Sequence, residues 1–354
     1  MDTIYIRRDT ADTCTSDNSY NGKYWPARVS SVLVLFVVSA LGAFTPLLAA
    51  YSTVFRIPAY VFDAIKYFGS GVIIATGFIH LLAEAAENLS NDCLGSPFTE
   101  YPFAEGIALI GVFFIFTFDL VAHQRLAVKT KALQEESELG LSSMEFVAFG
   151  GRCNRCPQDE GQGSVLSIKH TDGSTEIREA ENTQDLSKLE SMYQKILNCV
   201  VLECGIVLHS VFVGLSVTIA GDDFISLYIA ICFHQFFEGL GLGTRFATTQ
   251  WPTRKRYVPW VMALAYSLTT PIAAAIGLVV RQSYPSGSRT ALITTGVFDA
   301  ACGGILIYNS IAELMAYDFM YSGDFKNKPI KKIVIAFLYL SLGAFAMALI
   351  GKWA

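Results

Sequence analysis

The chain has 354 residues and a formal net charge of −5, and 52% of its residues are hydrophobic whereas only 16% are charged. A soluble domain usually contains about 25% charged residues, so this composition excludes a water-soluble globular protein and indicates an integral membrane protein. The net charge says little about partners, because the distribution of lysine and arginine between loops matters more in a membrane protein than their sum.

The N-terminal segment, residues 1–28, is polar and lacks the short apolar core and small-residue cleavage site of a secretory signal peptide. We expect it to be an extracytosolic tail, with the first apolar run acting as the targeting signal. Eight apolar runs follow, each with about the length of a membrane-spanning helix, for which roughly 20 residues suffice. The expected spans are 29–50, 65–87, 105–122, 196–219, 223–245, 257–280, 291–316 and 333–351. The sequence thus predicts an all-α integral membrane protein, with spans one to three in 29–122 and spans four to eight in 196–351.

Lysine and arginine are concentrated in alternate loops. The loops after spans one, three, five and seven contain basic residues, those after spans two and four contain none, and the loop after span six has only Arg281 and Arg289. The positive-inside rule then places both termini outside the cytosol. Four basic residues in the N-terminal tail count against this orientation, and four aspartates in the same tail partly offset them.

The segment 123–195 separates the third span from the fourth. It is rich in Ser, Glu, Gln and Gly and poor in aromatic residues, so we expect a flexible cytosolic loop rather than a folded domain. It contains Cys153 and Cys156 in a CxxC pattern without a second pair or nearby histidines, which is weak evidence for a structural zinc site. A metal-sensing or redox role for this pair and an ordinary pair of reduced thiols both stay open.

The remaining cysteines fall into two classes. Cys14 and Cys93 would both lie outside the cytosol, where a disulfide is chemically permitted, and the sequence leaves open whether they pair. The others lie within spans and are most simply small apolar fillers; they are Cys199, Cys204, Cys232 and Cys302.

Two neighbouring spans carry histidine deep in their apolar part. His209 lies in the fourth span, and His234 and Glu238 lie four residues apart in the fifth, so on a helix the imidazole and the carboxylate share one face. Ionisable side chains at this depth cost about 2.5–3.5 kcal/mol each on insertion scales, and they usually face a cavity or a pathway. Two imidazoles and a carboxylate can bind zinc or a similar divalent cation.

Further polar residues occur in the other spans. His80 and Glu84 lie near the outer end of the second span, which we interpret as an acidic, imidazole-bearing entrance for cations. Three further acidic residues could each be a structural hydrogen-bonding group, but together they extend a column of acceptors that a cation pathway requires. These residues are Asp119, Glu203 and Glu313.

The ligand types favour zinc or iron(II), because imidazole suits these ions whereas calcium and magnesium prefer all-oxygen sites. The column contains no ligand-like cysteine pair, which argues against a copper(I) pathway. We expect no enzyme activity, since the sequence lacks the HExxH motif that a membrane-embedded zinc hydrolase would use. A metal sensor that binds the ion without transporting it would keep the same residues, so that alternative stays open.

Four segments carry a resemblance to a known family: GSGVIIATGFIHLLAEA at 69–85, VLECGIVLHSVFVGLSV at 201–217, HQFFEGLGLGTR at 234–245 and GGILIYNSIAELMAYDF at 303–319. With these, the sequence resembles the ZIP (ZRT/IRT-like) family of divalent metal-ion transporters, and most of all its fungal plasma-membrane zinc-uptake members. The resemblance covers nearly all of the chain except the N-terminal tail and the 123–195 loop. It implies eight spans with both termini extracytosolic, and import of zinc, sometimes iron(II) or manganese(II), through an elevator-like movement.

The resemblance also implies roles for individual residues. It places the primary metal site between spans four and five, the outer entrance on span two and further acidic positions along the path. In that order, these residues are His209, His234 and Glu238 with Ser210 and Gln235 beside them; His80 and Glu84; and Glu203 and Glu313. Bacterial members place a second carboxylate where this chain has Val213, which favours a single-ion site.

The metal is the transported substrate, so we expect no resident cofactor. The expected partners are the divalent metal ion and the lipid bilayer, with no nucleic acid, and a homodimer is one option for the oligomeric state. The expected location is the plasma membrane. Zinc against iron(II), and a carrier against a channel, are not distinguished by the sequence.

Overall fold

The computed structural model describes residues 14, 22–52, 57–148, 173–222, 224–281, 287–321, 325 and 328–352. They belong to two compact units, a larger one drawn from Met1–Thr117 and Ile196–Ala354 and a smaller one, Phe118–Lys195. Every regular element in the described ranges is a helix. This confirms the predicted all-α fold class.

The helices in chain order are α1 (Trp25–Tyr51), α2 (Ala59–Ala75), the π-helix η1 (Thr76–Leu82), α3 (Ala83–Leu89), the short 3-10 helix η2 (Asp92–Leu94), α4 (Phe103–Ala148), α5 (Gly173–Ile219), α6 (Phe224–Thr248), the 3-10 helix η3 (Thr253–Lys255), α7 (Val258–Val280), α8 (Arg289–Asn309), the π-helix η4 (Ser310–Tyr321) and α9 (Ile330–Ile350). Proline marks several starts. Pro26 and Pro259 lie in the first turns of α1 and α7, where the missing N–H costs no hydrogen bond.

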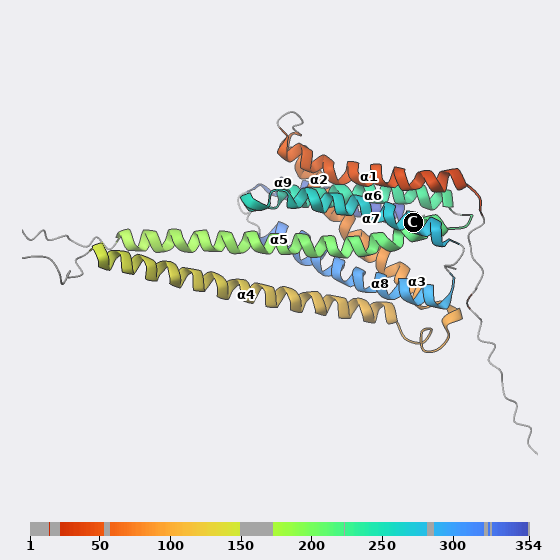
Figure 1. Cartoon of the computed structure of the whole chain (residues 1–354), viewed down its shortest axis with the longest axis horizontal. Helices are drawn as coiled ribbons and strands as arrows, with labels where there is room; N and C mark the ends of the chain where they lie inside the picture. Colours follow the sequence, from red (N-terminus) through yellow and green to blue (C-terminus); the bar gives the residue numbers. More distant parts are fainter. Residues whose placement is uncertain are drawn as a thin grey trace, which may run out of the picture. The chain divides into compact units, whose positions relative to one another are not determined.

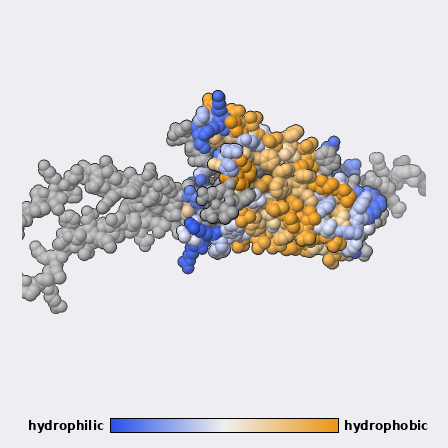
Figure 2. Space-filling view, turned by 90° about the horizontal axis from the view of Figure 1, so that it is seen from above, coloured by the Kyte–Doolittle hydropathy of each residue, from blue (hydrophilic) through white to orange (hydrophobic). Residues whose placement is uncertain are grey.

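Within the described residues, eight helical stretches are long and apolar enough to cross a membrane, which agrees with the predicted number of spans. They cover Trp25–Tyr51, Ala59–Leu89, Phe103–Arg125, Met192–Ile219, Phe224–Thr248, Thr253–Val280, Arg289–Met320 and Ile330–Ile350. Their ends lie within a few residues of the predicted ones. Figure 2 shows hydrophobic residues gathered over the middle of the helices, with hydrophilic residues toward the helix ends.

Within the larger unit the helices pack in two groups (Figure 1). In the first, called the α6 group, α1 packs against α6 and α7. Helix α5 joins this group through Gly214, where an added Cβ would lie 2.4 Å from the carbonyl oxygen of Thr270 on α7. In the second, called the α2 group, α2 packs against α9, its continuation through η1 and α3 packs against α8, and η4 contacts α8 and α2.

The two groups meet where α2 packs against α6, and glycine allows this contact. A Cβ at Gly69 would lie 2.2 Å from the Cα atom of Gly241, and a Cβ at Gly241 would lie 2.8 Å from the carbonyl oxygen of Gly69. Helix association inside a bilayer depends on close packing rather than on the hydrophobic effect, and small residues let two backbones approach. The α2–α6 contact is therefore a backbone-to-backbone contact at this point.

Replacing Gly69 with alanine should force α2 and α6 apart, because the added methyl group would overlap the backbone of Gly241. We expect the variant to lose about 1–3 kcal/mol of stability, the usual cost of overpacking, and to melt at a lower temperature in detergent. Gly205→Ala is the matched control, since its Cβ would meet only side chains, at 3.6 Å. Equal melting temperatures for Gly69→Ala and the wild type would contradict the close contact.

At the end of the larger unit where α1 begins, a disulfide and a buried arginine link segments that are far apart in the sequence. Cys14 and Cys93 form a disulfide, the pairing that the sequence left open. Arg28 is fully buried and donates hydrogen bonds to the carbonyl oxygens of Thr218 and Gly221, at 2.9 and 3.1 Å. The charge of Arg28, which counted against the predicted orientation, is thus bound to the turn between α5 and α6 rather than displayed in a loop.

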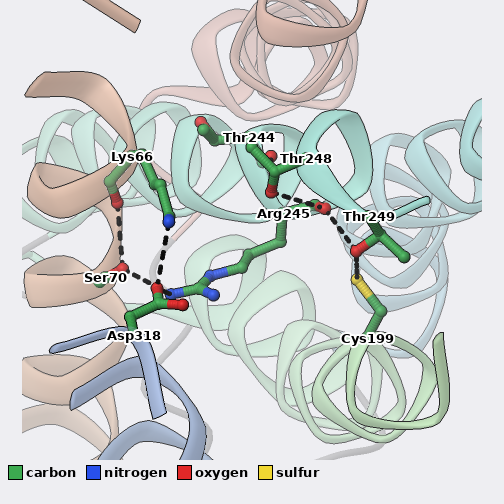
Figure 3. A network of polar contacts seen from close by, with 8 residues as sticks. All are labelled: Lys66, Ser70, Cys199, Thr244, Arg245, Thr248, Thr249 and Asp318. Carbon is green, nitrogen blue, oxygen red and sulfur yellow. Dashed lines mark hydrogen bonds and ion pairs between the residues drawn. The ribbon is translucent and has the colours of Figure 1, made fainter. Parts of the chain in front are cut away.

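Toward the C-terminal end of α6, an ion cluster ties the two groups together (Figure 3). Arg245 Nη2 lies 2.7 Å from Asp318 Oδ2, and Lys66 Nζ lies 3.5 Å from the same oxygen. The Arg245 guanidinium also donates to Ser70 Oγ at 2.9 Å. Asp318 is 6% exposed, so its buried negative charge has basic partners on both α2 and α6.

The predicted flexible loop over 123–195 is corrected in two parts. Helix α4 continues to Ala148 and α5 begins at Gly173, so 123–148 and 173–195 are helical. Both stretches contain several Leu, Glu, Gln and Lys residues, and these good helix formers outweigh the polar composition from which the loop was predicted. Cys153 and Cys156 lie outside the described residues, so their role stays a prediction.

Candidate metal site

Three histidines from three helical segments converge inside the larger unit. His209 lies on α5, His234 on α6 and His80 on η1, and one ligand nitrogen from each lies within 4.8 Å of the others. The ring centroid of His80 is 4.9 Å from that of His234 and 5.2 Å from that of His209. All three imidazoles are buried, with exposed fractions of 6% or less.

Five polar atoms of His80, His209, His234 and Glu238 lack hydrogen-bond partners among the described residues. They are Nε2 of His80, Nε2 of His209, both ring nitrogens of His234 and Oε1 of Glu238. Glu238 Oε2 lies 3.5 Å from His234 Nε2, one helical turn away as predicted. Buried polar atoms are nearly always hydrogen-bonded, so several unpartnered acceptors at one point fit a bound cation. Three imidazoles and a carboxylate are a donor set that suits zinc.

His80 lies closer to the predicted metal site than the sequence indicated. It lines one cavity together with Glu84, the other residue of the predicted entrance, and it also lies with His209 and His234 in the cluster. His80 belongs to the π-helical turn Thr76–Leu82. Such turns occur frequently at functional sites.

Gln235, which the resemblance placed beside the metal site, has hydrogen-bond partners for both ends of its side-chain amide. Its amide nitrogen donates to Thr270 Oγ1, and its Oε1 accepts a hydrogen bond of 2.7 Å from the Tyr266 hydroxyl. The same hydroxyl donates to the Gln235 carbonyl oxygen at 2.7 Å and lies 3.5 Å from Glu238 Oε2. Gln235 therefore fixes the rotation of α6 against α7, which sets the direction of His234 and Glu238.

Tyr266→Phe tests this brace. The variant leaves Gln235 Oε1 buried without its donor, which costs about 1–3 kcal/mol, and it frees the Glu238 carboxylate to move. We expect weaker zinc binding by the detergent-solubilised protein, measured by titration calorimetry. Tyr257→Phe is the control, because Tyr257 is 64% exposed. Unchanged zinc affinity in Tyr266→Phe would show that α7 does not position the ligands.

The other predicted residues are distributed more widely. Ser210 is fully buried and its Oγ has no hydrogen-bond partner in the described ranges. Glu203 is 8% exposed and lies six residues before His209 on α5, a rise of about 9 Å along the helix. Asp119 belongs to the smaller unit, where its carboxylate accepts a hydrogen bond from Gln194. Glu313 lies on η4, and its side chain is outside the described part of the chain.

Asp299 is a residue near the histidines that the sequence analysis missed. It lies on α8, is 1% exposed, and its Oδ1 is 3.4 Å from His209 Nδ1. A signal existed in the sequence, since a carboxylate within the apolar run 291–316 is as costly as those that were considered. Its distance from the histidine motifs along the chain hid the relationship.

A small cavity of about 20 Å³ adjoins the cluster. Its lining includes His80, Glu84, His209 and Asp299 together with apolar residues. A larger cavity of about 150 Å³ shares Glu84 with it and extends along the end of α5 and the start of α8. The two cavities thus connect the histidines with the end of the unit at which the disulfide lies.

Comparison with known proteins adds independent evidence. The model of a family described as "ZIP Zinc transporter" matches residues 26–351. The chain is 36% identical to Zinc-regulated transporter 2 of Saccharomyces cerevisiae over 420 aligned positions, which cover 99% of each protein. It is 37% identical to Zinc-regulated transporter 1 of the same yeast, covering 95% of this chain and 89% of the relative. It is also 30% identical to Fe(2+) transport protein 1 of Arabidopsis thaliana, covering 98% of this chain and 90% of the relative.

Proposed function

Because this chain belongs to the ZIP zinc transporter family, we propose that it is a multi-pass plasma-membrane protein that imports zinc into the cytosol. The observation that carries the proposal is the convergence of three buried imidazoles with the Glu238 carboxylate. Several relatives are named as transporters, which supports a role other than catalysis.

The ligand set agrees with transport. His80, His209 and His234 supply nitrogen and Glu238 supplies oxygen, a combination that binds zinc or iron(II) better than calcium or magnesium. In the structure the ligand nitrogens are up to 4.8 Å apart, wider than around an ion bound at about 2.0–2.1 Å. The ion therefore draws the side chains together when it binds, and a site of this kind releases its ion more readily than a closed structural one.

The cation path starts at the disulfide-bonded end, which the predicted orientation places outside the cytosol. An ion enters through the cavities beside Glu84 and reaches the histidines. Glu203 lies on α5 on the far side of the histidines from these cavities. The Arg245–Asp318 ion pair, which joins α6 to the α2 group, lies on that far side too. Cavities adjoin the histidines on the side of the disulfide, and an ion pair joins the two helix groups on the other side, so in this proposal import requires the two groups to change their contact.

Zinc uptake into proteoliposomes containing the purified protein tests the proposal. We expect saturable uptake that falls at least about tenfold in His234→Ala, since a direct ligand should matter no less than its supporting groups, whose loss costs 10–100-fold in affinity. His123→Ala is the matched control, because His123 is an exposed histidine on α4. Competition by iron(II), manganese and cadmium would rank the substrates.

If wild-type vesicles stay empty while the detergent-solubilised protein still binds zinc, the transport proposal fails. The protein would then be a membrane-embedded metal sensor.

A further inference from the structure

Two carboxylates and two imidazoles line the same small cavity beside the histidine cluster. Asp299 comes from α8, Glu84 from α3 and His80 from η1, whereas His209 comes from α5. Asp299 is almost completely buried and Glu84 is partly buried. Nothing about the His209–His234–Glu238 set requires this second pair of negative charges.

The only basic side chains that line the cavity with the two carboxylates, as far as the structure describes it, are the imidazoles of His80 and His209, and His209 Nδ1 lies 3.4 Å from Asp299 Oδ1. The described lining of the cavity consists of the four residues above with Phe212, Val213, Ser216, Leu227 and Ile231, and contains no lysine or arginine. Asp318 shows how this protein treats a buried carboxylate that serves the fold, since both Arg245 and Lys66 pair with it (Figure 3). A buried charge that is not neutralised is strongly unfavourable, and a cation bound between Asp299 and Glu84 would neutralise both carboxylates.

The cavity can also bind such a cation chemically. Nε2 of His80 and Nε2 of His209 are buried without hydrogen-bond partners among the described residues, which leaves nitrogen lone pairs for a metal. A volume of about 20 Å³ is close to what one water molecule needs. The cavity therefore has room for one ion and no room for a larger ligand.

We propose that Asp299 is a metal ligand of a second, transient binding site, the approach site, formed by Asp299, Glu84, His80 and His209. A first-row divalent cation such as zinc or iron(II), which accepts mixed nitrogen and oxygen ligands, occupies it before moving to His234 and Glu238. His80 and His209 belong to both sites, so the ion exchanges two carboxylates for one carboxylate and one imidazole without losing all its ligands. The inference rests on the proposed transport function for the direction of movement, but not for the binding itself.

If Asp299 had a different role, substitutions of it would have different effects. Its Oδ1 is 3.4 Å from His209 Nδ1, so it could act only as a hydrogen-bond acceptor that orients the imidazole. Asparagine keeps an acceptor oxygen but removes the charge, whereas glutamate keeps the charge. Asp299→Asn and Asp299→Glu therefore separate a metal ligand from a positioning residue.

The first experiment compares uptake kinetics in proteoliposomes. If Asp299 binds the ion, Asp299→Asn should raise KM for zinc about tenfold or more with a smaller change in the maximal rate, and Asp299→Glu should restore much of the loss. Asp222→Asn is the control, because it also removes a negative charge at this end of the unit. The Asp222 side chain is 76% exposed and does not line the cavity. A KM for Asp299→Asn equal to that of the wild type, with loss only in Asp299→Ala, would overturn the inference.

The second experiment measures zinc binding without transport. His234→Ala in detergent should retain weak zinc binding at the approach site, and adding Asp299→Asn should weaken it about tenfold further, with melting temperature as the check on folding. This result would stand even if the wild type transports no zinc, so it separates failure of the inference from failure of the proposed function. Absence of zinc binding in His234→Ala, or equal binding in the two variants, would contradict a separate approach site.

Discussion

The cost of placing an ionisable group inside a bilayer is the constraint on which this structure depends. The protein meets it in two ways. Asp318 is neutralised within the chain by Arg245 and Lys66, and that cluster holds two helix groups together. Glu238 has no lysine or arginine beside it among the contacts of the described residues, only His234 and the Tyr266 hydroxyl at 3.5 Å. In the proposed function its charge is neutralised by the transported ion.

The metal ligands depend on supports that do not touch the ion. Hydrogen bonds from Tyr266 and to Thr270 fix Gln235, and through it the face of α6 that carries His234. The contact of Gly69 with Gly241 brings α2 close to α6, so that His80 on η1, the continuation of α2, lies beside His234. Packing and hydrogen bonding therefore decide the geometry that the side-chain chemistry then uses.

The sequence predicted the eight spans, and it predicted that His209, His234 and Glu238 lie close together. Both predictions rest on local properties, the length of apolar runs and helical spacing. The sequence did not predict that His80 lies within reach of His209 and His234, since a π-helical turn cannot be recognised from side-chain periodicity. It missed Asp299, whose importance comes from a contact between helices far apart in the chain. For 123–195 it read polar composition as a loop, where helix propensity prevailed in the described parts.

The ligands come from both helix groups: His209, His234 and Glu238 from the α6 group, and His80 from the α2 group. A displacement of the α2 group along α6 would therefore lengthen the distance from His80 to His234 and Glu238. In the proposed import, the position of the α2 group and the affinity for the ion would change together. Such a displacement would itself remove one ligand and so help to release the ion.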